Sequence, residues 1–377
     1  MNGYRLRLAR GLRRLTQTQL AERAGTSQAT IAKLESGQLD ASADLLERLT
    51  LQIGFPVAFL LGTDPMELPE GSLLLYRKKA KLSKADQEHV YNLSQLALTA
   101  VAELRQRFKP IPKTFPLLCG SDPKRAAGLI RNALGLKPGA PVDRLVQRLE
   151  ASGVVCLALP IGEGCEGFDA FSALAGQETP VIAYHAGRPT DRVRMSVAHE
   201  AGHLALHGSA QLGPADAEAE AYGVAGELLL PSEELLSEMG SPLTVTELIR
   251  LKSRWGVSIA ALIQRARHLE RISVDQHKRL FIKLGKLGWR LNEPGSEQLA
   301  PEKPRLLARM FESVFRGDTR AFAESLGYPV SLVDALLAAN GVGPSSSASD
   351  RGRLVEFARP EPRNTATPVR FAPGGRR

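Results

Sequence analysis

The sequence has little cysteine and no long hydrophobic run. Its 377 residues include three cysteines, Cys119, Cys156 and Cys165, which form no CxxC pair. This pattern excludes a disulfide framework and a cysteine zinc knuckle, and it fits a reducing compartment. No apolar segment approaches the length that crosses a bilayer, so we expect a soluble, cytoplasmic protein without membrane contacts.

The overall composition is that of a folded protein. Hydrophobic residues make up 43% of the chain and charged residues 24%, which is close to the globular average and far from that of disordered or membrane proteins. A chain of 377 residues is longer than most single cores support, so two or three domains are expected.

Acidic residues are outnumbered by basic ones, which gives a formal net charge of +9. Such an excess suggests a polyanionic partner, and clustering of the basic residues favours nucleic acid over ordinary surface charge. The first cluster is Arg5, Arg7, Arg10, Arg13 and Arg14, and the second is Arg77, Lys78, Lys79, Lys81 and Lys84.

The first part of the chain, from Tyr4 to Gly62, has the pattern of a small helical bundle. Apolar residues recur there at mixed spacings of three and four. Thr16 is placed to cap one helix, Gly25 supplies a turn, and a second helix begins at Gln28. This spacing presents the second helix to the major groove of DNA, and the alternative is a helical hairpin used only for packing.

The segments RLRLARGLRRLTQTQLAERAG and SQATIAKLESG resemble the XRE/Cro-type helix-turn-helix family. The resemblance implies binding to double-stranded DNA, with the early arginines on the phosphate backbone. It also implies that four residues contact DNA, namely Gln17, Gln28, Thr30 and Lys33. A homodimer would suit a palindromic site.

The middle of the chain changes character near residue 65, where helix breakers are frequent and a linker is expected. Residues 83–108 have an amphipathic pattern that predicts one long helix. We interpret this helix as a spacer between domains, with a dimerisation helix as the alternative. From residue 110 onward, helical and strand signals alternate, which predicts a mixed α/β unit.

Histidine is rare, with seven residues in the chain, yet three of them lie within residues 199–207. On a helix, His199 and His203 of the HEAGH sequence project from one face and can bind one zinc ion. Glu200 occupies a neighbouring position, from which it can act on a water as general base without binding the metal. At this histidine content a chance HExxH match is on the order of one in a hundred.

A zinc hydrolase usually has a third protein ligand, and the following helical segment offers two carboxylates. Helical periodicity alone leaves Glu218 and Glu220 as equal candidates. His207 continues the face of His199 and His203, but it lies one more turn away. We therefore expect His207 to support the site and not to bind the metal.

The segments RVRMSVAHEAGHLALH and EAYGVAGELLLP resemble the ImmA/IrrE metallopeptidase family. The resemblance implies a zinc-dependent endopeptidase with Glu220 as the third metal ligand and Glu200 as the base. Tyr222 and Val224 stand where the family usually has asparagine and phenylalanine. Arg192 and Tyr184 are further candidates for supporting the site.

The resemblance also implies a metal cofactor and a substrate. One Zn²⁺ is expected, with Mn²⁺ or iron as alternatives for a His, His, Glu set. The implied substrate is a protein, a helix-turn-helix repressor whose cleavage switches on stress or mobile-element genes. The alternative is a transcriptional regulator whose metal-binding domain senses or is structural and does not cleave peptides.

The expected fold class is multidomain and mainly α, with an α+β zincin-like peptidase domain between an all-α helix-turn-helix bundle and a helical C-terminal region. The expected parts are residues 1–65 (helix-turn-helix), 66–109 (basic linker and long helix), 110–240 (peptidase), 241–342 (helical extension) and 343–377 (disordered basic tail).

Overall fold

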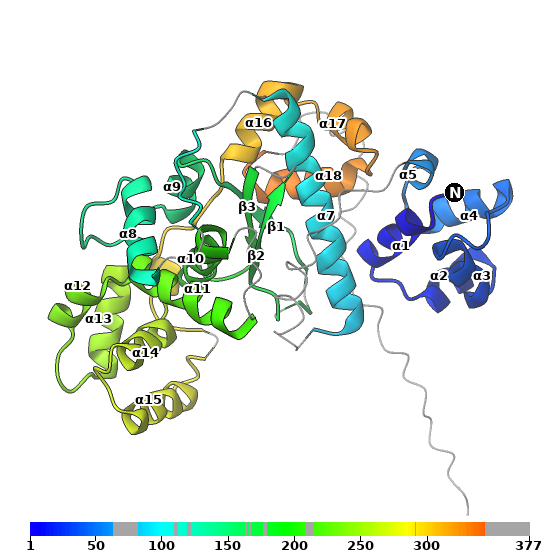
Figure 1. Ribbon diagram of the computed structural model, residues 1–377. Helices are drawn as coiled ribbons and strands as arrows, with labels where there is room; N and C mark the ends of the chain where they lie inside the picture. The colour runs from blue at the N-terminus through cyan, green and yellow to red at the C-terminus, as the bar shows by residue number, and fades with distance from the viewer. Residues whose placement is uncertain are drawn as a thin grey trace, which may run out of the picture.

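The computed structural model describes residues 1–62, 82–108, 112–118, 122–162, 164–165, 167–175, 179–207, 214–290 and 292–343. Most of these residues are helical, and the strands form one three-stranded sheet (Figure 1). This confirms the expected mainly α, multidomain class with an α+β unit. The expectations for Cys119, for the basic residues 77–81 and for the tail beyond residue 343 lie outside the described residues.

The N-terminal bundle is built from short helices with strong local signals. These helices are α1 (Gly3–Leu12), α2 (Gln17–Ala24), α3 (Gln28–Glu35), α4 (Ala43–Ile53) and α5 (Val57–Leu61). At the start of α2, the Thr16 hydroxyl accepts a hydrogen bond from the backbone amide of Gln19. The side-chain oxygen of Gln19 in turn accepts one from the backbone amide of Thr16. Gly25 ends α2 with a left-handed φ of 62°, which glycine adopts without strain. The predicted turn between α2 and α3 is therefore confirmed.

The long helix α7 (Lys84–Arg107) is a central element of the molecule. Every residue from Asn92 to Leu98 is buried, so α7 is covered on all sides over this stretch. It contacts α1 on one side and the sheet on the other, and Figure 1 shows it standing between the two. α7 therefore lies between the N-terminal bundle and the sheet, as a spacer would, but it is also part of the core, because different elements cover its different faces.

The sheet consists of β1 (Val155–Leu159), β2 (Ala170–Ala175) and β3 (Thr179–His185) in the order β1-β3-β2. β1 and β3 are parallel, and β2 is antiparallel to β3 and forms an edge. The other edge is covered by Asn340, whose side-chain amide exchanges two hydrogen bonds of 3.0 and 2.9 Å with the backbone of Ala158. This leaves β2 as the edge strand beside α10.

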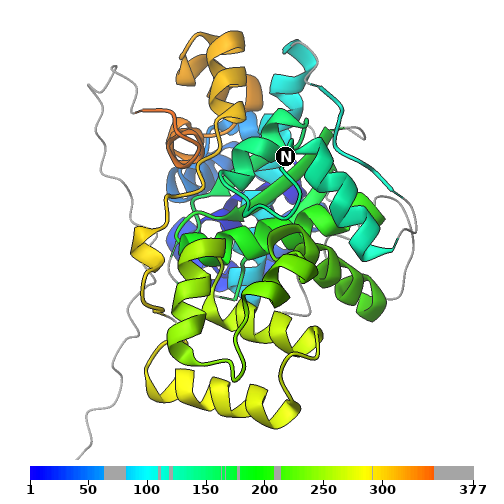
Figure 2. The same ribbon diagram turned by 90° about the vertical axis from the view of Figure 1, so that its left-hand side faces the viewer.

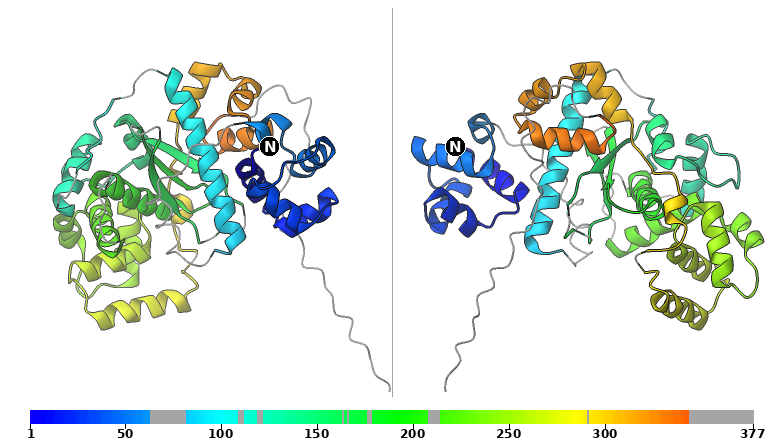
Figure 3. Two further views of the ribbon diagram at one scale, coloured as in Figure 1. Left: turned by 45° about the vertical axis from the view of Figure 1, so that its right-hand side comes forward. Right: turned by 180° about the vertical axis from the view of Figure 1, so that it is seen from behind.

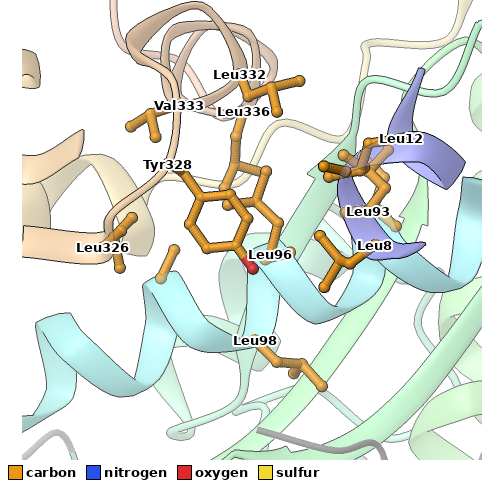
Figure 4. Packing of buried hydrophobic residues seen from close by; sticks show 14 of the residues in the cluster. Leu8, Leu12, Leu93, Leu96, Leu98, Leu326, Tyr328, Leu332, Val333 and Leu336 are labelled. Carbon is orange, nitrogen blue, oxygen red and sulfur yellow. The ribbon is translucent and has the colours of Figure 1, made fainter. Parts of the chain in front are cut away.

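One hydrophobic core joins the N-terminal bundle, α7, one side of the sheet and the last helices of the described chain. These last helices are α16 (Leu306–Phe315), α17 (Thr319–Leu326) and α18 (Val330–Ala339), and Figure 3 shows them beside α7; the short helix η1 (Ser296–Gln298) precedes them and contacts α10. In Figure 4, Leu8 and Leu12 of α1 and Leu96 of α7 lie in the same cluster as Tyr328 and Leu336. The bundle is thus packed onto the rest of the protein.

A second core lies on the other side of the sheet and holds the helix with the HEAGH sequence. Its helices are α8 (Pro123–Ala133), α9 (Leu145–Ala151), α10 (Thr190–His207), α11 (Pro214–Leu229), α12 (Ser232–Glu238), α13 (Val245–Trp255), α14 (Ile259–His268) and α15 (Val274–Lys286). In Figure 1, α12–α15 gather at the end of the molecule away from the N-terminal bundle, and in Figure 2 that end faces the viewer. The expected division at residue 240 falls inside this continuous core.

Among the described helices, none alone has the length and apolar character that crossing a membrane requires. α17 and α18 meet the requirement only as a pair that is bent by 115°.

Candidate functional site

The HEAGH sequence lies in the second half of α10, where its polar side chains are buried. His199, Glu200 and His203 are 4%, 4% and 6% exposed. The spacing of four residues puts the two histidines one turn apart, and their Nε2 atoms are 3.1 Å from each other. A Cβ at Gly202 would lie 3.0 Å from the backbone oxygen of Ala221, so glycine at this position allows α11 to approach α10 closely.

This approach brings a carboxylate of α11 to the two histidines. The oxygens of Glu218 lie 3.4 Å from His199 Nε2 and 3.6 Å from His203 Nε2. The three side chains offer ligand atoms within 4.8 Å of one another. Hydrogen bonds to His199 and then His203 hold the pKa of Glu218 well below its ordinary value, so this carboxylate is ionised at neutral pH.

The structure places Glu220 away from the histidine pair. Its Oε2 lies 3.0 Å from His207 Nε2, and His207 Nδ1 lies 3.0 Å from His203 Nδ1. Residues two apart on a helix point about 200° away from each other, so Glu218 and Glu220 do not face one point. The third donor beside His199 and His203 is therefore Glu218, where the sequence resemblance had indicated Glu220.

Glu200 is hydrogen-bonded to a residue of the sheet. Ser172 of the edge strand β2 donates a hydrogen bond of 2.8 Å to Glu200 Oε2. Sequence analysis did not predict this strand, because Ala170–Ala175 contains three alanines and few residues of high β propensity. In the structure, buried and partly exposed positions alternate along β2.

Tyr222 is a second residue that sequence analysis did not assign to the site. Its ring centroid lies 4.1 Å from that of His199, and 48% of the residue is exposed. The tyrosine therefore covers one face of His199 from the solvent side. It occupies the position where the resembled family usually has asparagine.

A cleft of about 750 Å³ opens beside these residues. His199 and Glu200 line it, and Met195, Ala261 and Phe281 are among its apolar lining residues. Its walls come from α10, α11, α14 and α15, so helices beyond residue 240 contribute to the cleft that contains the HEAGH residues.

The two other expected supporting residues have different surroundings. Arg192 lines the cleft and donates a hydrogen bond to the carbonyl of Arg290. Tyr184 is buried, and its hydroxyl donates to the carbonyl of Glu302 at 2.8 Å. Burial raises the pKa of Tyr184 well above its ordinary value. Its hydroxyl is therefore engaged by the chain segment before α16 and not by the residues of α10.

The four residues expected to contact DNA lie together on α2 and α3. Gln28 and Lys33 are exposed, and Thr30 is half-buried. Gln28 donates a hydrogen bond of 2.7 Å to Gln17, which in turn donates one of 2.8 Å to Glu35. These bonds orient the two glutamine amides along one face of the helix pair.

Two of the early arginines, Arg5 and Arg10, are buried in contacts within the protein, whereas the side chain of Arg7 is 62% exposed. Arg10 is 6% exposed and bonds to Glu35 of α3 at 2.6 Å and to Glu88 of α7 at 3.3 Å. Arg5 is 9% exposed and donates to the carbonyl of Phe59 at 3.0 Å. These guanidinium groups are used inside the protein because carboxylates and carbonyls from later helices meet them there.

The N-terminal bundle docks on α7 through buried polar contacts. His89 Nδ1 lies 3.1 Å from the Leu12 carbonyl, and Asn92 donates to the Leu8 carbonyl at 3.3 Å. Burial, followed by the charge of Arg14, lowers the pKa of His89 to about 4. The docked arrangement therefore holds a neutral imidazole.

Acidification is expected to destabilise this docking. Because the pKa of His89 is about 4 in the folded protein and 6.5 in its ordinary state, the unfolded chain binds more protons between these values. The attraction of Asp86 opposes this shift, but the repulsion from Arg14 and burial outweigh it. Stability should fall by about 1.4 kcal/mol per pH unit across this window.

Urea denaturation of the wild type and of His89→Asn between pH 6.5 and 5 measures this effect. The wild type should lose about 1.5 kcal/mol more than the variant over this range, since only the wild type carries the titrating imidazole. Parallel losses in the two proteins would show that His89 does not control the pH dependence.

Comparison with protein families gives two matches. Residues 149–267 match the family described as the IrrE N-terminal-like domain, and residues 6–60 match the helix-turn-helix family. No curated protein is similar enough to this chain to count as a match. The first match begins at α9 and ends in α14, so it extends past the expected boundary at residue 240. The chain thus joins a helix-turn-helix domain of the XRE type to an ImmA/IrrE-like domain of a metallopeptidase family.

Proposed function

We propose that this protein is a DNA-binding regulator with zinc-dependent endopeptidase activity. The observation that carries the proposal is the convergence of His199, His203 and Glu218, together with a cleft that is lined by His199 and Glu200. The family match supports a peptidase-like domain, and the helix-turn-helix supports binding to double-stranded DNA.

The donor set fits a zinc ion. Zinc bonds of about 2.0–2.1 Å at tetrahedral angles hold ligand atoms roughly 3.3 Å apart. The two Nε2 atoms are 3.1 Å apart, Glu218 Oε2 lies 3.4 Å from His199 Nε2, and Glu218 Oε1 lies 3.6 Å from His203 Nε2. Two imidazole nitrogens and one carboxylate leave a fourth position open, which is the arrangement of a catalytic zinc site, and Mn²⁺ is the alternative metal.

Residues of the chain itself would carry out the proton transfers of peptide hydrolysis. When bound, Zn²⁺ supplies Lewis acidity toward a water and toward the peptide carbonyl. Glu200 takes a proton from the attacking water and delivers it to the leaving amine. Ser172 holds Oε2 of Glu200 at 2.8 Å, so we assign the proton transfer to Oε1.

The edge strand β2 gives a way to present an extended substrate. β2 pairs with β3 on one side only, and Ser172 connects it to Glu200. A peptide that adds to this edge by backbone hydrogen bonds would pass beside the HEAGH residues. We propose that the substrate is a protein segment of this kind, and that it belongs to a helix-turn-helix repressor.

Metal removal tests the proposal. Purified protein is mixed with helix-turn-helix repressors encoded near its gene, after chelation and after addition of zinc or manganese. We expect cleavage to disappear with chelation and to return with the metal, because Lewis acidity is needed to activate the water. Absence of metal-dependent cleavage with every repressor would contradict the proposal.

The second function is transcriptional regulation without peptide cleavage, with a sensing or structural metal domain. Both functions use the exposed face of α3, where Gln28 and Lys33 are available to DNA. Gln28→Ala should weaken specific binding by about 1–3 kcal/mol, whereas Lys33→Ala should mainly reduce the salt dependence.

Binding titrations at several salt concentrations check these two effects, with Lys286→Ala on the distant helix α15 as control. Unchanged binding in Gln28→Ala would remove this residue from the interface. If DNA binding and gene regulation persist while no cleavage is found, the second function is favoured over the first.

A further inference from the structure

A row of polar side chains leads from the two histidines of the HEAGH sequence to α11. His203 Nδ1 lies 3.0 Å from His207 Nδ1, and His207 Nε2 lies 3.0 Å from Glu220 Oε2. The side chains of His203 and His207 are 6% and 10% exposed, so the contact between them is largely shielded from water, whereas the side chain of Glu220 is 38% exposed. Neither His207 nor Glu220 belongs to the group of donors that surrounds the metal position.

The proton positions in this row follow from the role of His203. Its Nε2 faces His199 and Glu218, so a neutral His203 that binds a metal there carries its proton on Nδ1. That proton needs an acceptor, and the neighbouring atom is Nδ1 of His207. A neutral His207 then carries its own proton on Nε2, where the carboxylate of Glu220 accepts it.

The two histidines of the pair are supported differently. His203 has this polar row behind it, whereas the buried Nδ1 of His199 has no hydrogen-bond partner among the described residues. His199 is instead packed against the ring of Tyr222 at 4.1 Å. Hydrogen bonds thus define the ring orientation of His203, but not that of His199, among the described residues.

We propose that His207 and Glu220 are positioning residues that fix the ring orientation and the tautomer of His203 for metal binding. Glu220, the glutamate that matches the family motif, then acts on the metal only through His207. This inference rests on the proposed function, because it takes His199, His203 and Glu218 as the metal ligands. Hydrogen-bonded partners of this kind typically contribute 10–100-fold to metal affinity.

The test is the zinc dissociation constant of the full chain, measured by competition with a chromophoric chelator. Glu220→Gln and His207→Phe are each expected to weaken zinc binding about 10–100-fold. The double variant should be no weaker than His207→Phe alone, because both residues act through one chain of hydrogen bonds. Glu220→Asp, which keeps the carboxylate, should recover part of the affinity.

Glu218→Gln is the reference for loss of a ligand, and its zinc affinity should fall by more than the ~100-fold upper end for a positioning residue. Cobalt in place of zinc gives a second readout, since its visible spectrum reports the ligand set. The spectrum should persist in Glu220→Gln and change in Glu218→Gln. The melting temperature of the metal-free protein should be the same in the wild type and in Glu220→Gln.

Three results would overturn the inference. The first is an equal loss of affinity in Glu220→Gln and Glu218→Gln with a changed cobalt spectrum, which would make Glu220 a ligand. The second is a zinc affinity in Glu220→Gln that equals that of the wild type. The third is a wild-type protein that binds no zinc, which would also remove the metal centre of the proposed function.

Discussion

Glu200→Gln is expected to lower the rate of peptide cleavage by about 10²–10⁴-fold, the range that a positioned general base contributes. Glutamine has nearly the same shape and retains an oxygen for the hydrogen bond from Ser172, but it cannot take a proton from water. Because Glu200 lies outside the group formed by His199, His203 and Glu218, the variant should still bind zinc. Cleavage rates and zinc content of the same samples measure both effects.

The matched control is Glu324→Gln on α17, an exposed residue remote from the cleft. It should cleave at the wild-type rate and bind the same amount of zinc. Cleavage by Glu200→Gln at a rate near that of the wild type would exclude this residue as the base. Loss of zinc together with cleavage would mean that Glu200 contributes to the metal site itself.

The parts of the fold that sequence predicted correctly depend on local chemistry. The capping residue Thr16 and the turn at Gly25 act within a few residues of their own positions, and both appear as expected. The spacing of His199 and His203 also needs only one turn of helix to bring their Nε2 atoms to 3.1 Å. Such features require no knowledge of distant parts of the chain.

The choice between Glu218 and Glu220 depends on a contact between two helices. α11 packs closely against α10 at Gly202, and this contact helps to set which side of α11 faces the histidines. A sequence motif identifies the helix, but it does not define the rotation of that helix about its axis. The motif indicated Glu220, whereas the packing brings Glu218 to the pair.

The burial of Arg10 and the position of α7 were not predicted from the sequence for a related reason. A cluster of positive charge indicates an anionic partner, but that partner can be inside the same chain. Arg10 meets Glu35 and Glu88, which lie 25 and 78 residues away in sequence. The position of α7 between the N-terminal bundle and the sheet likewise follows from packing that spans the whole chain.

A buried ionic cluster ties the start of α10 to the helices that follow residue 240. The ammonium group of Lys252 on α13 is 1% exposed and donates hydrogen bonds to Asp191, Glu293 and Ser296. Glu293 also accepts a hydrogen bond of 2.6 Å from the backbone amide of Ile259 in the first turn of α14. The cluster therefore connects the helix of the HEAGH sequence with the helices that line the far wall of the cleft.

Lys252→Met is expected to destabilise the protein by about 3–5 kcal/mol, because it leaves two buried carboxylates without their cation. Adding Asp191→Asn and Glu293→Gln to this variant removes both negative charges and should recover part of the loss. Urea denaturation measures the free energy of unfolding of the wild type, of Lys252→Met and of the triple variant. The control is the exposed Lys278→Met of α15, which is expected within about 0.5 kcal/mol of the wild type.

A loss in Lys252→Met no larger than in Lys278→Met would show that the cluster does not hold these helices together. A loss that the two added substitutions do not reduce would assign the effect to packing of the lysine stem, since the unpaired charges would then be absent.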